Sequence, residues 1–366
     1  MFSQRAASIA LHLRRQAPLS VTQPLSKPVN ANNNSYLALT GHHKLGWRRV
    51  HRAMYLRLSG REKYCHARIS HKWKRGLWLY KGIPQIDDAL MALPSRCMLA
   101  EQGLAMDLNT DPHLATIFDG DPRFNRVLSD PQTFRPEDYD FVIVPSFKRR
   151  LLKQKISLLR KLPSISMRGF YTGPEFHRGE FDAQRLADAL GLKPSSPVLL
   201  EHARQKLKPL PLTLTTPRSH LQMAIVLDGA DPLRSHQNWR ALANRLDKSH
   251  LPEVTLLGSA NELDVGRAFK RHWNGPLHNW VNQTDLAQCR QLMSDQRIVL
   301  AFDGGLMHLA ATTPVPLISL FTLTVEPVWR FPGDGPAWAL QLASNDVNAI
   351  DPDEIARLVR QTIAIA

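Results

Sequence analysis

The chain of 366 residues is long enough for two domains of ordinary size, each with its own core. Its apolar fraction of 43% is normal for a soluble globular protein, and no run of about 18 or more apolar residues occurs, which argues against a membrane span. Cys65, Cys97 and Cys289 are far apart and match no metal-ligand spacing, so we expect a reducing compartment and no structural disulfide.

The net charge of +15 is concentrated near the N-terminus. Residues 1–80 hold 15 Lys and Arg against one acidic residue, Glu62, so the rest of the chain is nearly neutral. Residues 1–20 are Arg-rich and free of acids, which superficially suits an organellar transit peptide, but they lack the apolar core and cleavage site of a secretory signal. We predict a basic, partly disordered extension over residues 1–75.

Within and just beyond this extension, residues 46–80 interleave Arg and Lys with Trp and Tyr. One interpretation is a surface that binds anionic lipid head groups, because basic residues are attracted to an anionic membrane. Nucleic acid would be a second partner. The alternative is a solvated amphipathic helix and tail.

Strands and helices then alternate. The first domain covers residues 76–205. The pattern predicts strands at 75–82, 126–131 and 140–146, the last two as a pair, and helices at 87–103, at 148–162 (basic and amphipathic) and at 181–194, which ends at Gly191 and Pro194. A proline-rich linker is predicted at 206–220.

The second domain, residues 206–366, alternates more regularly. The pattern predicts strands at 221–230, 252–260, 296–305 and 315–322, and helices at 238–248, 261–273, 285–295 and from 305 onward. This alternation indicates an α/β fold with parallel sheets covered on both faces, and two such domains would enclose a cleft at the carboxyl ends of their strands. No internal sequence repeat is evident.

The stretch "IVLAFDGGLMHLAA" ends an apolar strand with Asp303, Gly304 and Gly305. The strand would deliver Asp303 to the cleft, and the glycines would let a ligand approach the backbone without a Cβ in the way. The helix that follows presents unpaired N–H groups, which suits an anionic diphosphate. Many turns of this kind hold no ligand, so the three residues alone are a weak signal.

The longer segment "DGGLMHLAATTPVPLISLFTLTVEPVWRFP", residues 303–332, resembles the heptosyltransferase family, glycosyltransferase family 9, which transfers heptose from ADP-heptose to the lipopolysaccharide inner core. The resemblance extends over about residues 222–335 and, faintly, over 76–130. It implies a GT-B fold, in which two Rossmann-like domains face each other and the C-terminal one holds the nucleotide-sugar. It implies no metal or other cofactor, since backbone amides and basic side chains manage the diphosphate.

By position, the resemblance assigns donor-binding residues to the second domain. They are Asp303, Gly304, Gly305 and His308 at the diphosphate and sugar, Glu262 at the ribose, Gln237 near the diphosphate, and Thr322 and Thr324 at the end of the next strand. Two of these have ordinary structural alternatives: His308 could be a buried helix histidine, and Glu262 a first-turn carboxylate favoured by the helix dipole.

The catalytic base is expected in the first domain. "YKGIPQIDDALMALPSR" places Asp88 at the family's aspartate, which would accept the proton of the acceptor hydroxyl in an inverting transfer. The alternative is that Asp87 or Asp88 is only the N-cap of the helix.

Two departures from the family leave a second hypothesis open. Pro84, Gln85 and Ile86 replace the glycines of the first turn, and Gln237 replaces a lysine that would offset the charge of the leaving diphosphate, unless Arg234 or His236 compensates. The chain is therefore either an inverting transferase that acts on lipopolysaccharide or another surface glycan, or a catalytically silent relative that binds a glycan, a nucleotide or a protein.

The resemblance also implies a cytoplasmic protein, peripheral on the inner face of the bacterial inner membrane, with the basic arm on anionic lipid. A nucleic-acid binder is a third and more distant hypothesis. Because a bacterial location conflicts with the transit-peptide-like start, we interpret that start as an arm or a misplaced start codon.

Overall fold

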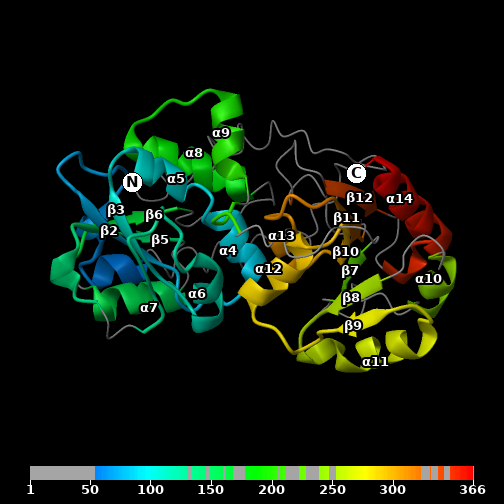
Figure 1. Cartoon of the computed structure of the whole chain (residues 1–366). Helices are drawn as coiled ribbons and strands as arrows, with labels where there is room; N and C mark the ends of the chain where they lie inside the picture. The colour runs from blue at the N-terminus through cyan, green and yellow to red at the C-terminus, as the bar shows by residue number, and fades with distance from the viewer. Residues whose placement is uncertain are drawn as a thin grey trace. The chain divides into compact units, whose positions relative to one another are not determined.

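The computed structural model describes most of the chain after residue 53. The described residues are 54–130, 134–145, 149–159, 161–167, 178–204, 206–210, 222–227, 239–246, 253–322, 330, 337–341 and 347–365. They form two compact units that divide between Lys208 and Pro209, and each is treated by itself below (Figure 1). Among these residues, no helix is long and apolar enough to cross a membrane.

The first unit is built on a six-stranded, all-parallel sheet with the strand order β1-β6-β5-β2-β3-β4. Its strands are β1 (Cys65–His66), β2 (Arg75–Leu79), β3 (Ala105–Asn109), β4 (Arg126–Leu128), β5 (Phe141–Val144) and β6 (Ser164–Ser166). Its helices are α4 (Ile86–Ala92), α5 (Arg96–Glu101), α6 (Pro112–Phe118), α7 (Arg149–Leu158), α8 (Arg178–Leu190) and α9 (Ser196–Ala203), with short 3₁₀ turns η1 (Glu62–Tyr64) and η3 (Pro136–Asp138).

Residues 54–75 belong to this unit, which corrects the prediction of a separate extension for the part of it that the structure describes. Leu56 is 1% exposed and packs in one apolar cluster with Leu77 and Val142. Strand β1 pairs with β6, and the ring of Trp73 stacks on Phe141 at 5.4 Å between centroids. The charge pattern marked this segment as solvated, but its few apolar side chains complete the core of the first unit.

The second unit has a six-stranded parallel sheet in the order β12-β11-β10-β7-β8-β9. Its strands are β7 (Gln222–Val226), β8 (Glu253–Leu257), β9 (Leu277–Asn279), β10 (Ile298–Phe302), β11 (Leu317–Phe321) and β12 (Ala337–Gln341). Its helices are α10 (Trp239–Arg245), α11 (Leu263–His272), α12 (Leu286–Ser294), α13 (Gly305–Ala310) and α14 (Pro352–Ile365), with 3₁₀ turns η4 (Ala260–Glu262) and η6 (Val347–Ala349).

Helices cover both faces of the second sheet. Figure 1 shows α10, α11 and α14 on one side of it and α12 and α13 on the other. Ile298, Leu300 and Phe302 of β10 pack in one cluster with Phe269 of α11 and Val359 of α14. All five residues of β10 are buried, because a parallel strand between two helical layers has no solvent-facing side.

The two units repeat one strand order although the sequence shows no repeat. If β7–β12 are renumbered 1 to 6 along the chain, the strand order across the second sheet is 3-2-1-4-5-6, the order of dinucleotide-binding folds. If β2–β6 are renumbered 1 to 5, the order across the first sheet is 3-2-1-4-5, with β1 added at its edge. In each sheet the order reverses beside the first strand of this series, between β7 and β10 and between β2 and β5. Ligands of open α/β sheets bind outside the carboxyl ends of the strands at such a reversal.

Several predicted elements differ from the structure. The helix predicted at 87–103 is two helices, α4 and α5, since Pro94 between them has no N–H to donate to the preceding turn. The strands at 126–131 and 140–146 are not a pair: β4 pairs with β3, and β5 lies between β2 and β6. The other predicted strands and helices coincide with observed ones to within a few residues.

The sequence analysis missed β3, whose middle residue is the fully buried Asp107. This carboxylate accepts hydrogen bonds from Arg126 Nη2 at 2.7 Å, Asn125 Nδ2 at 3.0 Å and Tyr139 Oη at 2.8 Å. Burial alone would raise the pKa of Asp107, but these three hydrogen bonds lower it. Strands β1, β6, β9 and β12 and helices α6, α9 and α14 were also missed. Strands β1, β6 and β9 have only two or three residues, too few to show a period.

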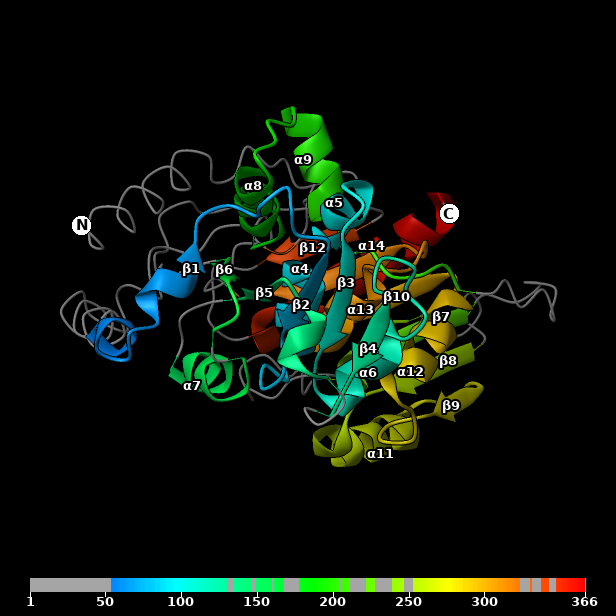
Figure 2. The ribbon, with the colours of Figure 1, turned by 90° about the vertical axis from the view of Figure 1, so that its left-hand side faces the viewer.

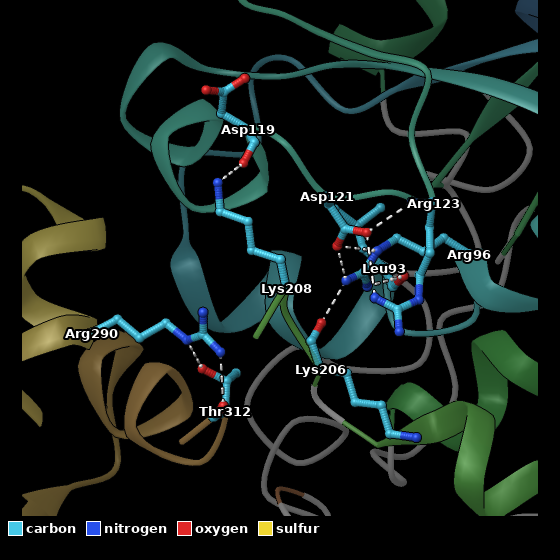
Figure 3. Close-up of polar contacts among 9 residues, drawn as sticks. All are labelled: Leu93, Arg96, Asp119, Asp121, Arg123, Lys206, Lys208, Arg290 and Thr312. Carbon is cyan, nitrogen blue, oxygen red and sulfur yellow. Dashed lines mark hydrogen bonds and ion pairs between the residues drawn. The ribbon is translucent and has the colours of Figure 1, made fainter. Parts of the chain in front are cut away.

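A buried ion pair fixes the chain where it leaves the first unit (Figure 3). The guanidinium of Arg96 donates to Asp121 Oδ2 from Nε at 3.1 Å and from Nη2 at 2.5 Å. It also donates to the carbonyls of Leu93, at 2.8 Å, and Lys206, at 2.5 Å. Two residues further on, the Nζ of Lys208 donates to the carbonyl of Asp119. The chain is therefore held to the first unit up to the point at which the units divide.

Lys155 of α7 is buried without a hydrogen-bond acceptor among the described residues. Its side chain is 3% exposed, and its Nζ lies 5.5 Å from the centroid of the Tyr64 ring. Burial lowers the pKa of Lys155, because the charged form loses its hydration. Burial likewise raises the pKa of the neighbouring Cys65 thiol, so this thiol is not activated.

We predict that Arg96→Ala lowers the free energy of unfolding by about 3–5 kcal/mol, because it leaves the Asp121 carboxylate buried and uncompensated. Urea unfolding would measure this loss. The control is Arg267→Ala, which removes an exposed pair with Asp264 and should change the free energy by less than about 0.5 kcal/mol. Equal effects of the two substitutions would contradict a structural role for the buried pair.

We predict that Lys155→Met raises the free energy of unfolding by about 1 kcal/mol at neutral pH, because it removes a buried charge and keeps an apolar stem. The lowered pKa means that the unfolded chain binds more protons than the folded one between the folded-state pKa and the ordinary value of 10.5, so wild-type stability rises with pH in this window. The advantage of the variant should therefore shrink toward pH 10.5. Thermal unfolding at a series of pH values measures this, and a constant difference would refute it.

Candidate functional site

The Asp-Gly-Gly turn lies at the carboxyl end of β10, beside the reversal of the second sheet. The N–H of Asp303 donates to the carbonyl of Leu320 at 3.2 Å, so the β10–β11 pairing continues one residue past the strand. Gly304 is extended, and α13 begins at Gly305. The turn thus places a carboxylate and two residues without side chains where a ligand of this fold class binds.

Asp303 is paired with a cation that the sequence analysis did not single out. Its Oδ1 lies 3.3 Å from Nε of Arg330, and the two side chains are 7% and 12% exposed. Arg330 belongs to the "VWRFP" stretch that carries the family resemblance, so a basic residue inside that stretch was the available signal. The pair places a guanidinium beside the Asp-Gly-Gly turn.

His308 lies one turn into α13 and is fully buried. Its backbone N–H donates to the carbonyl of Gly304 at 3.4 Å. Complete burial fits the alternative of a buried helix histidine, and contact with a donor stays a prediction.

Glu262 closes a capping box at the carboxyl end of β8. Its Oε2 accepts from the backbone N–H of Ser259 at 2.8 Å and from the hydroxyl of Ser259 at 2.7 Å, and its side chain is buried. The Ser259 hydroxyl in turn accepts from the N–H of Asn261 at 3.3 Å. The structural alternative for Glu262 therefore has direct support, in the form of a reciprocal cap. Ribose binding stays a prediction.

The remaining donor-site residues divide into two groups. Thr322 is buried and directly follows β11, the neighbour of β10, so it lies at the same edge of the sheet as Asp303. Gln237 and Thr324 lie outside the described residues, as do Arg234 and His236. The structure thus brings Asp303, Thr322 and Glu262 to the carboxyl edge of one sheet.

A buried arginine fixes the helix that starts at the Asp-Gly-Gly turn (Figure 3). Arg290 of α12 donates from Nε to the hydroxyl of Thr312 at 2.8 Å and from Nη2 to its carbonyl at 3.0 Å. The Thr312 hydroxyl donates to the carbonyl of Leu309 at 2.7 Å. Because these bonds secure the C-terminal end of α13, they also fix the orientation of its first turn at Gly305.

Asp88 belongs to the first unit, in the first turn of α4. The N-cap of this helix is Gln85, so the alternative that Asp87 or Asp88 is the N-cap is wrong. Both carboxylates lie in the first turn, where the helix dipole favours negative charge. Asp88 is half-buried and follows β2, the strand at the reversal of the first sheet.

The turn before α4 is held by residues at the start of α6. The N–H of Gly82 donates to Asp111 Oδ2 at 2.9 Å, and His113 Nε2 lies 2.7 Å from the carbonyl oxygen of Pro84. The residues that replace the family's glycines thus form an anchored turn, which presents Asp88 from a fixed backbone.

We predict that Glu262→Ala lowers the free energy of unfolding by about 1–2 kcal/mol, because it removes the acceptor of two hydrogen bonds in the cap. Urea unfolding measures this. Asp264→Ala, an exposed acidic residue in the next turn, is the matched control and should have a much smaller effect. If Glu262→Ala is as mild as the control, the capping role is refuted.

Comparison with known proteins finds a family match within the second unit. Residues 234–345 match the family model of glycosyltransferase family 9 (heptosyltransferase), a segment that contains Asp303, His308, Glu262 and Arg330. A sequence search of curated proteins finds no match.

Solved structures share the fold at low identity. A family 9 glycosyltransferase from Veillonella parvula aligns with a TM-score of 0.68 and 11% identity over 82% of this chain and 100% of its own. The Escherichia coli ADP-heptose lipopolysaccharide heptosyltransferase II aligns with a TM-score of 0.62 and 17% identity over 80% and 99%. E. coli heptosyltransferase WaaC, solved with ADP, aligns with a TM-score of 0.62 and 15% identity over 79% and 99%.

These alignments identify the fold as the GT-B fold of the heptosyltransferases, in line with the two parallel sheets. The resemblance to glycosyltransferase family 9 that the sequence predicts is thereby confirmed over residues 234–345.

Proposed function

We propose that this protein is an inverting glycosyltransferase, which moves heptose or a related sugar from a nucleotide donor to lipopolysaccharide core or another surface glycan. The observation that carries the proposal is the Asp303-Gly304-Gly305 turn. It lies at the reversal of a dinucleotide-binding strand order, inside the segment that matches the family model.

On the donor side, the turn admits the diphosphate against backbone, and Asp303 and Thr322 supply polar groups at the same edge. Arg330 supplies positive charge beside Asp303, which would stabilise the diphosphate as it leaves and so compensate for the uncharged Gln237. An ADP-sugar is the expected donor, because WaaC has been solved with ADP and with an ADP-2-deoxy-2-fluoro heptose.

On the acceptor side, Asp88 takes the proton of the acceptor hydroxyl as its oxygen attacks the anomeric carbon. The bond from that carbon to the diphosphate breaks on the opposite face, so the configuration inverts and the nucleoside diphosphate leaves. The proposal includes no metal ion, since basic side chains and backbone amides can hold the diphosphate. A lipid-borne acceptor would place the enzyme peripherally on the cytoplasmic face of the bacterial inner membrane.

A catalytically silent relative is the second candidate. It is favoured by the partners that Glu262 and Asp303 already have within the protein and by the anchored turn that replaces the family's glycines. Such a protein would bind a nucleotide or a glycan without transferring sugar.

We predict that isothermal calorimetry detects binding of ADP, and not of UDP or GDP, by the full-length protein. Asp303→Ala should weaken this binding at least tenfold, since it removes a polar group of the turn and the carboxylate that holds Arg330 in position. Asp264→Ala, at an exposed acidic residue of the same unit, is the control and should leave affinity unchanged. If the folded protein binds none of the three nucleotides, the transferase proposal fails.

The same preparation separates the two candidates. With ADP-heptose and a lipopolysaccharide core acceptor, Asp88→Asn should abolish transfer while ADP affinity stays at the wild-type value, and a chelator should have no effect. ADP binding without any transfer by the wild-type protein would instead establish the silent relative.

A further inference from the structure

The first unit carries a compact exposed apolar surface at its N-terminal edge. Five large apolar side chains are exposed among the described residues, and three of them lie in one helical segment, 54–58: Met54 at 52%, Tyr55 at 39% and Leu58 at 82%. Residues four and three apart share a helix face, so these three side chains form one ridge. The other two, Val198 and Trp280, are single exposures elsewhere.

The orientation of this ridge is fixed by the core. Leu56, on the opposite side of the segment, is 1% exposed and packs against Leu77 and Val142. The helix ends at Gly60, whose φ of 62° suits glycine, and the N–H of Arg61 closes the turn on the carbonyl of Leu56 at 3.0 Å. The ridge therefore points away from the core in the folded protein, and Figure 2 shows this blue segment on the β1 side of the first sheet.

The described segment that carries the ridge is rich in positive charge. Arg57 lies within the helical segment and is exposed, and Lys63 is exposed five residues after Leu58. Between residues 54 and 75 the sole acidic residue is Glu62. Exposed apolar side chains in a segment with exposed cations match a surface that is negatively charged outside and apolar beneath.

We propose that the Met54–Tyr55–Leu58 ridge docks the protein on an anionic lipid bilayer, with the three side chains inserted among the lipids and Arg57 and Lys63 on the head-group phosphates. Two aliphatic side chains at the centre favour lipid over nucleic acid, whose bases stack on aromatic rings. The inference rests on the proposed function for its purpose, since it brings a transferase to a lipid-borne acceptor, and it assigns that task to folded residues rather than to the arm before them.

The test is co-sedimentation of the full-length protein with vesicles of phosphatidylcholine, with and without phosphatidylglycerol. We expect binding to the anionic vesicles only, and a loss of about tenfold or more in the Met54→Glu/Leu58→Glu variant, because insertion is prevented. The matched control is Val198→Glu/Trp280→Glu, which adds the same charge at exposed apolar positions elsewhere and should bind almost as well as wild type. Because all four side chains are exposed, circular dichroism should show folded protein in every case.

A second pair of variants tests the charges. Arg57→Glu/Lys63→Glu should weaken binding to anionic vesicles at least tenfold, whereas Lys270→Glu/Arg271→Glu, on the exposed face of α11, should weaken it far less. If vesicle binding is unchanged in both Met54→Glu/Leu58→Glu and Arg57→Glu/Lys63→Glu, the proposal is overturned, and the arm before residue 54 is left as the anchor. Binding to short RNA or DNA that depends on Arg57 and Lys63 but not on Met54 and Leu58, with no vesicle binding, would assign the surface to nucleic acid.

Failure of this inference can be told apart from failure of the proposed function. The ridge variants should keep the wild-type affinity for ADP, because the donor site lies in the other unit. If the protein binds vesicles but no nucleotide, the docking role of the ridge is supported and the transferase proposal fails. If it binds ADP but no vesicles, the docking role fails and the transferase proposal stands.

Discussion

The burial of the second parallel sheet between two helical layers is the constraint on which the candidate site depends. All five residues of β10 are apolar and buried, and a carboxylate inside such a strand would need partners to neutralise it, since neither face meets water. The first position available to a carboxylate is therefore the one just past the strand, where Asp303 stands. All strands of the sheet run in the same direction, so Thr322 after β11 and Glu262 after β8 reach the same edge. The reversal of strand order between β7 and β10 then makes this edge the place where a ligand can enter.

The sequence could predict those features that depend on short-range pattern. The apolar run of β10, the glycines after Asp303 and the helix stop at Gly191 are each visible within a few residues, and each is found in the structure. Features that depend on distant partners could not be predicted in this way. Asp107 is tolerable inside β3 only because Arg126 and Tyr139 reach it from later segments, and two-residue β1 exists only because β6 pairs with it. Arg330 is of the same kind, because nothing local shows that it meets Asp303.

The protein partners of Asp303 and Glu262 bear on how a donor would bind. A carboxylate held by Arg330, or by the N–H and hydroxyl of Ser259, loses little freedom when a ligand arrives, which reduces the ordering cost of binding. The same contacts can also exist purely to stabilise the fold, as the capping box does. The two roles are compatible for Glu262, because a cap uses one carboxylate oxygen and leaves the other available. For Asp303 they would be coupled under the proposed function: an approaching diphosphate would attract the guanidinium that now neutralises the carboxylate, so Arg330 would link occupancy of the turn to the position of Asp303.

The N-terminal segment shows why charge pattern alone is a poor guide to order. Residues 54–75 are strongly basic, yet Leu56, Trp73 and the β1–β6 pairing place them in the first unit. A disordered arm that meets a membrane must give up conformational entropy when it binds, and this offsets part of the attraction. A helix that the core already holds in place gives up much less. The same folding that buries Leu56 turns Met54 and Leu58 outward, so burial of one side chain defines the exposure of the other two. A fixed apolar ridge with adjacent cations would also set the orientation of the first unit on the bilayer, which a flexible basic arm could not do.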